Sequence, residues 1–152
     1  MTENRGIIFS DVDGTLCFHK DAHRIETVAK NSDGTYRVES PDRGTRHRVF
    51  DISVSSYRVF LDEETQRLGQ ALQREFEFVY VTGGRPSTVK GRREYLNFAD
   101  AVILENGGLI LDRDYEIVQP WYDLLDTERA FLKDVAHELE SKGWALDATG
   151  RT

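Results

Sequence analysis

Short apolar runs along the chain, each closed by turn-forming residues, predict a set of core strands. Residues 7–9 stop at a Ser-Asp pair, residues 76–81 stop at a Thr-Gly-Gly turn, and residues 101–104 stop before an Asn-Gly pair. Runs of this length between turn signals favour buried strands. Because the Asn-Gly pair lies between residues 101–104 and 109–111, these two segments are expected to pair as a hairpin.

Longer stretches with a helical apolar period predict helices over residues 62–74, 86–96 and 126–143. Asp62 followed by two glutamates is typical of a helix start, and Pro86 suits the first position of a helix. The expected buried face of the first helix consists of Leu68, Ala71 and Leu72. The expected apolar face of the last helix consists of Phe131, Leu132, Val135 and Leu139, and Gly143 is expected to end it. Residues 144–146 suggest one more strand.

Residues 19–55 differ from the rest of the chain in both pattern and charge. Alternating apolar and polar positions predict an antiparallel meander with strands over 25–30, 35–39 and 50–54. Within 19–48, seven Lys and Arg residues stand against five acids. Two interpretations stay open: a flap that sets positive charge over a bound phosphate, and a solvated hairpin with ordinary surface charge.

Composition narrows the function classes. The 152 residues are 39% hydrophobic with a net charge of −7, which is typical of one globular domain and argues against a non-specific nucleic-acid binder. No apolar run approaches the roughly 20 residues of a membrane span, and the N-terminus lacks a signal-peptide pattern, so we expect a cytoplasmic protein. Cys17 is the only cysteine and is expected to be a packing residue.

Asp11 and Asp13 follow the first apolar run. In an extended segment, residues two apart point the same way, so both carboxylates are expected to face one site at the carboxyl end of the strand. Two close carboxylates repel unless a cation lies between them, and Mg²⁺ takes such oxygen ligands. A carboxylate can also attack phosphorus. The structural alternative is a strand followed by an Asp-Gly turn.

The segment 82–86, Thr-Gly-Gly-Arg-Pro, follows the second strand and opens a helix. Backbone N–H groups at such a strand-to-helix turn can hold an anion, although the same residues also suit a plain turn. With its apolar lead-in, the segment 11–16, Asp-Val-Asp-Gly-Thr-Leu, resembles the first motif of the haloacid dehalogenase (HAD) superfamily, and Thr82 with its glycines resembles the second. Further on, residues 105–108, Glu-Asn-Gly-Gly, resemble the sugar-phosphate phosphatases of the Cof, sucrose-phosphatase and mannosylphosphoglycerate-phosphatase type.

The resemblance implies a chemistry and its residues. Asp11 would be the nucleophile that forms an aspartyl-phosphate, and Asp13 the general acid and base. Asp11 and the backbone carbonyl of Asp13 would ligate Mg²⁺. The phosphate-binding residues would be Thr82, Gly83, Gly84 and Arg85. The expected partner is a small phosphorylated substrate, a sugar or sugar acid. A phosphomutase, and a non-catalytic or truncated module that binds phosphate and Mg²⁺, remain alternatives.

The implied fold is α/β, with a three-layer Rossmann-like core over 1–18 and 56–111, a β insertion over 19–55, and an incomplete cap over 112–152. The third HAD motif, a lysine, and the fourth, an acidic pair, are not visible; Lys90, Arg92 and Arg93 are expected on a solvated helix face. We therefore expect the N-terminal portion of a longer phosphatase. Without the later strand, residues 7–9 would form an open sheet edge, which invites association with the same chain or a partner. Mg²⁺ binding would be weak, and turnover poor or absent.

Overall fold

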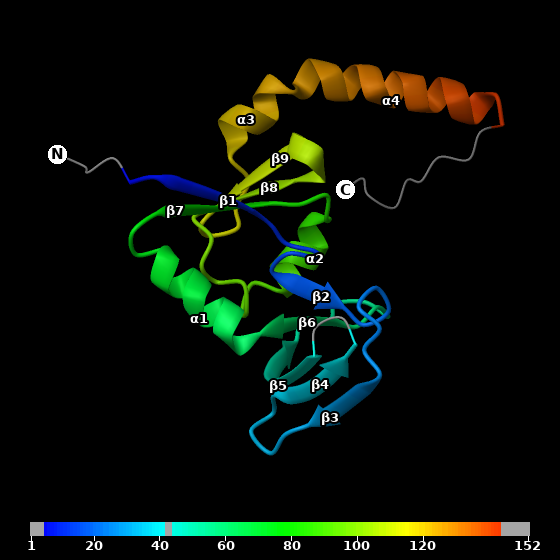
Figure 1. The fold of residues 1–152 in the computed structure, drawn as a ribbon. Coiled ribbons are helices and arrows are strands. Elements are labelled where there is room, and N and C mark those ends of the chain that lie inside the picture. Colours follow the sequence, from blue (N-terminus) through cyan, green and yellow to red (C-terminus); the bar gives the residue numbers. More distant parts are fainter. Residues whose placement is uncertain (1–4, 42–43, 144–152) are drawn as a thin grey trace.

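The computed structural model describes residues 5–41 and 44–143, apart from the side chain of Asn106, and shows an α/β chain with two β-sheets (Figure 1). The strands are β1 (Ile7–Asp11), β2 (Cys17–His19), β3 (Thr27–Lys30), β4 (Tyr36–Ser40), β5 (Gly44–Asp51), β6 (Val59–Asp62), β7 (Glu77–Val81), β8 (Ala101–Leu104) and β9 (Leu109–Asp112). The helices are α1 (Glu63–Leu72), α2 (Pro86–Gly91), α3 (Gln119–Leu124) and α4 (Asp126–Ser141), and a 3₁₀ turn η1 (Glu105–Gly107) follows β8. The strand expected over residues 144–146 lies outside the described residues.

The main sheet has the strand order β1-β7-β8-β9. β1, β7 and β8 run parallel, and β9 pairs antiparallel with β8 through the predicted hairpin. The three core strands expected from the apolar runs are thus confirmed. Because parallel strands end at the same edge of a sheet, the segments that follow β1 and β7 meet there. Within the described part of the chain β1 is an edge strand, as expected.

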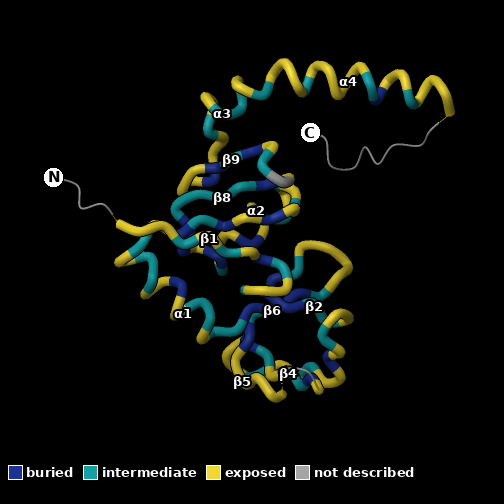
Figure 2. The backbone as a smooth tube through the Cα atoms, turned by 45° about the horizontal axis from the view of Figure 1, so that its top comes forward, coloured by how far each residue is buried: buried dark blue, intermediate teal, exposed yellow. Residues whose placement is uncertain are grey.

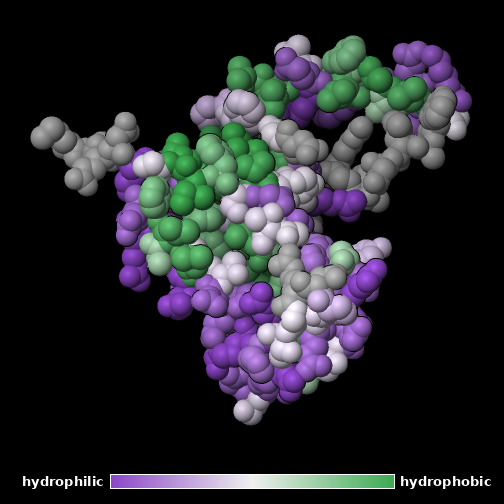
Figure 3. Space-filling view, in the orientation of Figure 1, coloured by the Kyte–Doolittle hydropathy of each residue, from purple (hydrophilic) through white to green (hydrophobic). Residues whose placement is uncertain are grey.

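Alternating side chains give the main sheet two unlike faces. Phe78, Tyr80 and Val102 are buried on the face covered by α1 and α2. On the opposite face Ile7 is 54% and Phe9 62% exposed. Figure 3 shows apolar surface gathered over this part of the molecule. A three-layer arrangement needs helices on both faces of the sheet. Since the described helices do not bury these side chains, the three-layer arrangement remains a prediction.

Helix α1 packs through a glycine. Phe98 lies so close to Gly69 that a Cβ there would stand 2.2 Å from the ring atom Cε2 of Phe98. The prediction for this helix was therefore partly wrong. Leu68 and Ala71 are exposed, while Leu72 is half-buried and packs against the core. Its start was predicted correctly, because the Asp62 side chain accepts a hydrogen bond from the backbone N–H of Glu64 at 2.9 Å.

The second sheet, called the insertion sheet below, has the order β2-β6-β5-β4-β3, with every pair antiparallel. It extends beyond the expected insertion, because β2 and β6 also belong to it. Side chains alternate along these two strands. Cys17, Val59 and Leu61 join the main core, while Phe18 and Phe60 join a second core. The second core therefore sits directly against the main one.

The expected third strand of the insertion was placed wrongly. β5 runs over Gly44–Asp51 and stops where residues 50–54 were expected to be extended. At this point Asp51 Oδ1 accepts hydrogen bonds from the backbone N–H and the hydroxyl of Ser53. Such side-chain bonds compete with the strand ladder and turn the chain toward β6.

Helices α2 and α4 begin close to where they were predicted. α2 starts at Pro86 but ends at Gly91 rather than at residue 96. α4 ends at Ser141, with Gly143 in the left-handed region at φ 85°. Phe131 on α4 is 65% exposed, and Figure 2 shows mostly exposed positions along this helix. The predicted apolar face of α4 therefore exists, but the described residues bury little of it. Among those residues, no helix has the length and apolar character needed to cross a lipid bilayer.

Candidate functional site

The carboxyl ends of β1 and β7 bring the two candidate motifs together. Asp11, the last residue of β1, lies opposite Val81, the last residue of β7, in the parallel register. Thr82 follows Val81 directly, and its backbone N–H donates to the carbonyl of Ile103 at 2.9 Å. The structure thus places Asp11 and Thr82 side by side in the sheet, at the carboxyl ends of two neighbouring parallel strands.

A tight turn shapes the chain after Asp11. Val12 is buried in the core at 2% exposure, whereas Asp11 is exposed and Asp13 half-buried. The backbone N–H groups of Leu16 and Cys17 donate to the carbonyl of Val12 at 3.1 and 2.9 Å. Gly14 has φ 92°, a backbone conformation that strongly favours glycine. The turn therefore returns the chain into β2 immediately after the two carboxylates.

Asp11 is open to solvent and has a hydroxyl beside it. The Thr15 hydroxyl donates to Oδ2 of Asp11 at 3.2 Å. This bond uses one of the several lone pairs of the carboxylate, so the oxygens can still act as a ligand or as a nucleophile.

Asp13 is held on one of its oxygens. Oδ1 lies 2.8 Å from Nη1 of Arg92 and 3.1 Å from Nε2 of His19. The Arg92 side chain is only 6% exposed. The expectation that Arg92 lies on a solvated helix face with Lys90 and Arg93 is therefore wrong. α2 ends at Gly91, so the helical period does not apply to Arg92, and no local signal in the sequence marked this residue as part of the site.

Thr82 is a buried polar residue at 5% exposure. Its hydroxyl oxygen accepts a hydrogen bond from the backbone N–H of Gly84 at 3.0 Å. A hydroxyl has one proton and two lone pairs, so this contact leaves the proton for an anion. Gly83 and Arg85 are exposed at the start of α2. The segment thus has the form of a turn whose hydroxyl is fixed in place.

Three arginines of the insertion, Arg37, Arg46 and Arg48, are paired with carboxylates. Arg48 contacts Asp33 at 2.9 Å and also Glu63 on α1. Arg46 lies 3.7 Å from Asp62. These pairs favour the interpretation of the insertion as a hairpin with ordinary surface charge over that of a basic cover for phosphate.

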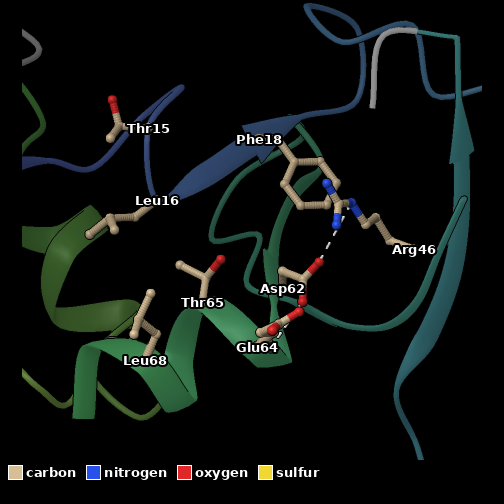
Figure 4. A pocket seen from close by; sticks show the side chains of 8 residues that line it. All are labelled: Thr15, Leu16, Phe18, Arg46, Asp62, Glu64, Thr65 and Leu68. Atoms are coloured by element: carbon tan, nitrogen blue, oxygen red, sulfur yellow. Dashed lines mark hydrogen bonds and ion pairs between the residues drawn. The ribbon is translucent and has the colours of Figure 1, made fainter. Parts of the chain in front are cut away.

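A cavity of about 260 Å³ lies between the insertion sheet and α1, beside the turn that follows Asp13 (Figure 4). Thr15 and Leu16 line it from the turn, Arg46 and Asp62 from the insertion sheet, and Thr65 from α1. Hydroxyl, guanidinium and carboxylate groups border it together with the apolar side chains of Leu16, Phe18 and Leu68, which suits a molecule that has both polar and apolar parts.

The residues present offer a partial donor set for Mg²⁺. Among the described residues, no three His, Cys, Asp or Glu side chains gather closely enough to hold a metal ion. Asp11 can supply its carboxylate. Oδ1 of Asp13 is occupied by Arg92 and His19, so the atoms with which Asp13 can still act as a ligand are Oδ2 and its backbone carbonyl; the resemblance implies the carbonyl. Because Mg²⁺ usually keeps several waters and shares substrate phosphate oxygens, two protein oxygens fit a weak site.

Cys17 behaves as predicted. It is fully buried, and burial raises the pKa of its thiol from 9.0 to about 12, so it is a neutral packing residue.

Residues 112–114 form a second Asp-x-Asp sequence. Asp112 Oδ1 accepts from the backbone N–H groups of Asp114 and Glu116 at 2.9 and 3.0 Å. This sequence therefore forms a turn.

Comparison of the chain with models of known protein families and with curated proteins gave no match.

Proposed function

We propose that this chain carries the phosphoryl-transfer site of a HAD-like phosphatase and hydrolyses phosphomonoesters with the help of Mg²⁺. The observation that carries the proposal is the meeting of its two motif segments. Asp11 ends β1, and Thr82 follows the neighbouring parallel strand β7. A nucleophile and a phosphate-binding hydroxyl need this proximity. The three-layer Rossmann-like core belongs to the same proposal.

In the first step, an oxygen of Asp11 attacks phosphorus and the bond from phosphorus to the ester oxygen breaks. Asp13 gives its proton to the departing oxygen, so the leaving group departs as an alcohol. In the second step, water attacks the aspartyl-phosphate, and Asp13 takes a proton from that water. Phosphate is released, and Asp11 is again a carboxylate. Asp11 can take the role of nucleophile because its carboxylate is exposed.

The phosphate would be held by the Thr82 hydroxyl and the backbone N–H of Gly83, with Gly84 fixing the hydroxyl and Arg85 reaching the substrate. The Asp11 carboxylate and the backbone carbonyl of Asp13 would hold Mg²⁺, which when bound offsets the negative charge that gathers on the phosphoryl oxygens. The cavity beside Thr15 is where we place the rest of the substrate, a sugar or sugar acid.

A second candidate is a module that binds phosphate and Mg²⁺ without efficient turnover. The partial metal donor set favours it, and among the described residues no lysine forms an ion pair with Asp11. The two candidates predict the same binding of phosphate and Mg²⁺ but different rates of phosphate release.

The test is phosphate release from a panel of phosphorylated sugars and sugar acids, with and without Mg²⁺. Because the described residues offer only a partial Mg²⁺ donor set, we expect slow, Mg²⁺-dependent release and a phosphorylated protein that can be trapped by acid quenching. Phosphate binding without release would support the binding module instead. Release that is the same in the presence of a chelator would contradict both.

A further inference from the structure

Three segments far apart in the sequence meet at one carboxyl oxygen. Asp13 lies after β1, His19 ends β2 of the insertion sheet, and Arg92 follows α2. Arg92 Nη1 and His19 Nε2 both contact Oδ1 of Asp13, at 2.8 and 3.1 Å. Each partner comes from a different element, so the carboxyl group is fixed from two directions.

The chemistry of the partners assigns the hydrogens. A guanidinium group only donates, and an ionised carboxylate oxygen only accepts. Nε2 of His19 must therefore carry the hydrogen that faces Asp13. Oδ1 then accepts two hydrogen bonds. When the carboxyl group is protonated, its proton belongs on Oδ2, because a proton on Oδ1 would point at two donors.

The burial of Arg92 shows that this contact is needed by the fold. Its side chain is 6% exposed, and its Nε has no hydrogen-bond partner among the described residues. Removing a guanidinium from water is costly unless an acceptor or a counter-charge compensates it. Oδ1 of Asp13 provides the acceptor, and the carboxylate provides the counter-charge when it is ionised. By contrast, the neighbouring Arg93 is exposed, and its contact with Asp114 is 3.6 Å long.

We propose that Arg92 and His19 are positioning residues for Asp13: together they hold Oδ1 and thereby direct the protonated Oδ2 toward the leaving group. The inference rests on the proposed function, because it assigns the orientation of the general acid in that reaction. It also gives the insertion sheet a role, since His19 links β2 directly to Asp13.

The dependence of rate on the leaving group tests this role. An alkyl phosphate needs a proton on its departing oxygen, whereas 2,4-dinitrophenyl phosphate does not. The quantity to compare is kcat/KM, because it reports the steps up to departure of the leaving group. A residue that only supports the fold would lower kcat/KM for both esters alike.

The primary variant is His19→Leu, at a side chain that is 34% exposed. General acid help is typically worth about 10²–10⁴-fold, so we expect a loss of at least about tenfold with the alkyl phosphate and little loss with the dinitrophenyl ester. His19→Gln, which keeps a donor at nearly the place of Nε2, should restore most of the rate. Arg92→Gln should show the same selectivity, with Arg93→Gln as its matched control.

Two further results would decide against the role. Equal losses with both esters would overturn it while leaving the proposed function intact. A double variant Asp13→Asn/His19→Leu that is much slower than Asp13→Asn alone would also overturn it, because a positioning residue acts only through Asp13.

A measurement without turnover separates the two proposals. If the parent protein hydrolyses neither ester with Mg²⁺, the proposed function fails. The position of the ring hydrogen of His19 then tests its contact with Asp13. ¹⁵N NMR should show the Nε2–H tautomer in the parent, and the chemical shift of that N–H should move in Asp13→Ala, because its hydrogen bond to Oδ1 is lost. An Nδ1–H tautomer in the parent, or an unchanged Nε2–H shift in Asp13→Ala, would overturn the inference.

Discussion

Asp11 and Asp13 are two positions apart in the chain but have different surroundings. Asp11 is exposed and receives one hydrogen bond, from Thr15. Asp13 is half-buried and receives two on one oxygen, from His19 and Arg92. Substitutions of the two residues should therefore differ in their effects on stability as well as on activity.

Asp11→Asn should abolish phosphate release and leave the urea midpoint of unfolding nearly unchanged. A neutral amide is neither a nucleophile nor an anionic ligand, and exposed substitutions usually change stability by less than about 0.5 kcal/mol. Phosphate release and urea unfolding on the same preparation measure both effects. Activity at the parent level would rule out the aspartyl-phosphate.

Thr82→Ala should weaken the binding of phosphate or vanadate. A hydrogen bond to a charged group is worth about 1.5–3 kcal/mol, which corresponds to roughly 10- to 150-fold in affinity. Isothermal titration calorimetry measures this change, and Thr82→Ser, which keeps the hydroxyl, is the control. Equal affinity in the parent and in Thr82→Ala would mean that the segment 82–86 is a plain turn and does not bind phosphate.

Cys17 should make stability fall at high pH. Its pKa is raised from 9.0 to about 12 in the folded protein, because burial disfavours the thiolate. The group therefore stabilises the fold fully below pH 9, and this contribution is lost as the pH rises from 9 toward 12, by about 1.4 kcal/mol per pH unit. Urea unfolding at pH 8 and pH 10 should show a larger decrease for the parent than for Cys17→Ala. Parallel decreases would mean that the folded protein already exposes the thiol.

At the scale of elements, close packing overrides helix propensity in α1. Gly69 is the buried residue of this helix, and it faces the Phe98 ring. Phe98 in turn packs edge-on against Phe78 and Tyr80 of β7, at centroid distances of 5.3 and 5.4 Å. The glycine thus sets the distance between α1 and the main sheet.

Gly69→Ala should destabilise the protein by about 1–3 kcal/mol, because the new methyl group forces Phe98 away from its aromatic neighbours. Propensity alone predicts the opposite, a gain of about 1 kcal/mol from Gly to Ala within a helix. The sign of the change in the free energy of unfolding decides between them. Ala71→Gly, at an exposed position two residues later, should lose about 1 kcal/mol and calibrates the propensity.

At the scale of the whole molecule, the main sheet leaves both an edge and a face uncovered in the described residues. No described strand pairs with the outer side of β1, and its side chains Ile7 and Phe9 are more than half exposed. Val81 on β7 adds to the same face at 37% exposure. An apolar edge strand of this kind readily pairs with another strand.

We expect the isolated chain to associate with itself through β1. Phe9→Lys should shift sedimentation toward the monomer, because a charge on an edge strand disfavours pairing. Leu68→Lys is the matched control, since Leu68 is a similarly exposed apolar residue at 56%, on α1 instead of the sheet edge. A parent that sediments as a monomer at high concentration would contradict the expectation, and so would equal shifts in both variants.

Local sequence determined the parts of this protein that depend on neighbouring residues. The apolar runs and their turns predicted β1, β7, β8 and the hairpin to β9, and the caps predicted the starts of α1 and α2. They also put Asp11 and Thr82 at the ends of their strands. Alternation, capping and turn formation act over a few residues, so the sequence alone expresses them.

Tertiary structure decided which side chains meet across the molecule. Arg92 and Asp13 are 79 positions apart, and their contact exists because α2 ends one residue before Arg92 and turns it inward. The inward face of α1 follows from the place of Phe98, and the end of β5 follows from the bonds between Asp51 and Ser53. Such contacts depend on how elements pack, and packing is settled by all of their surfaces together, which no local pattern records.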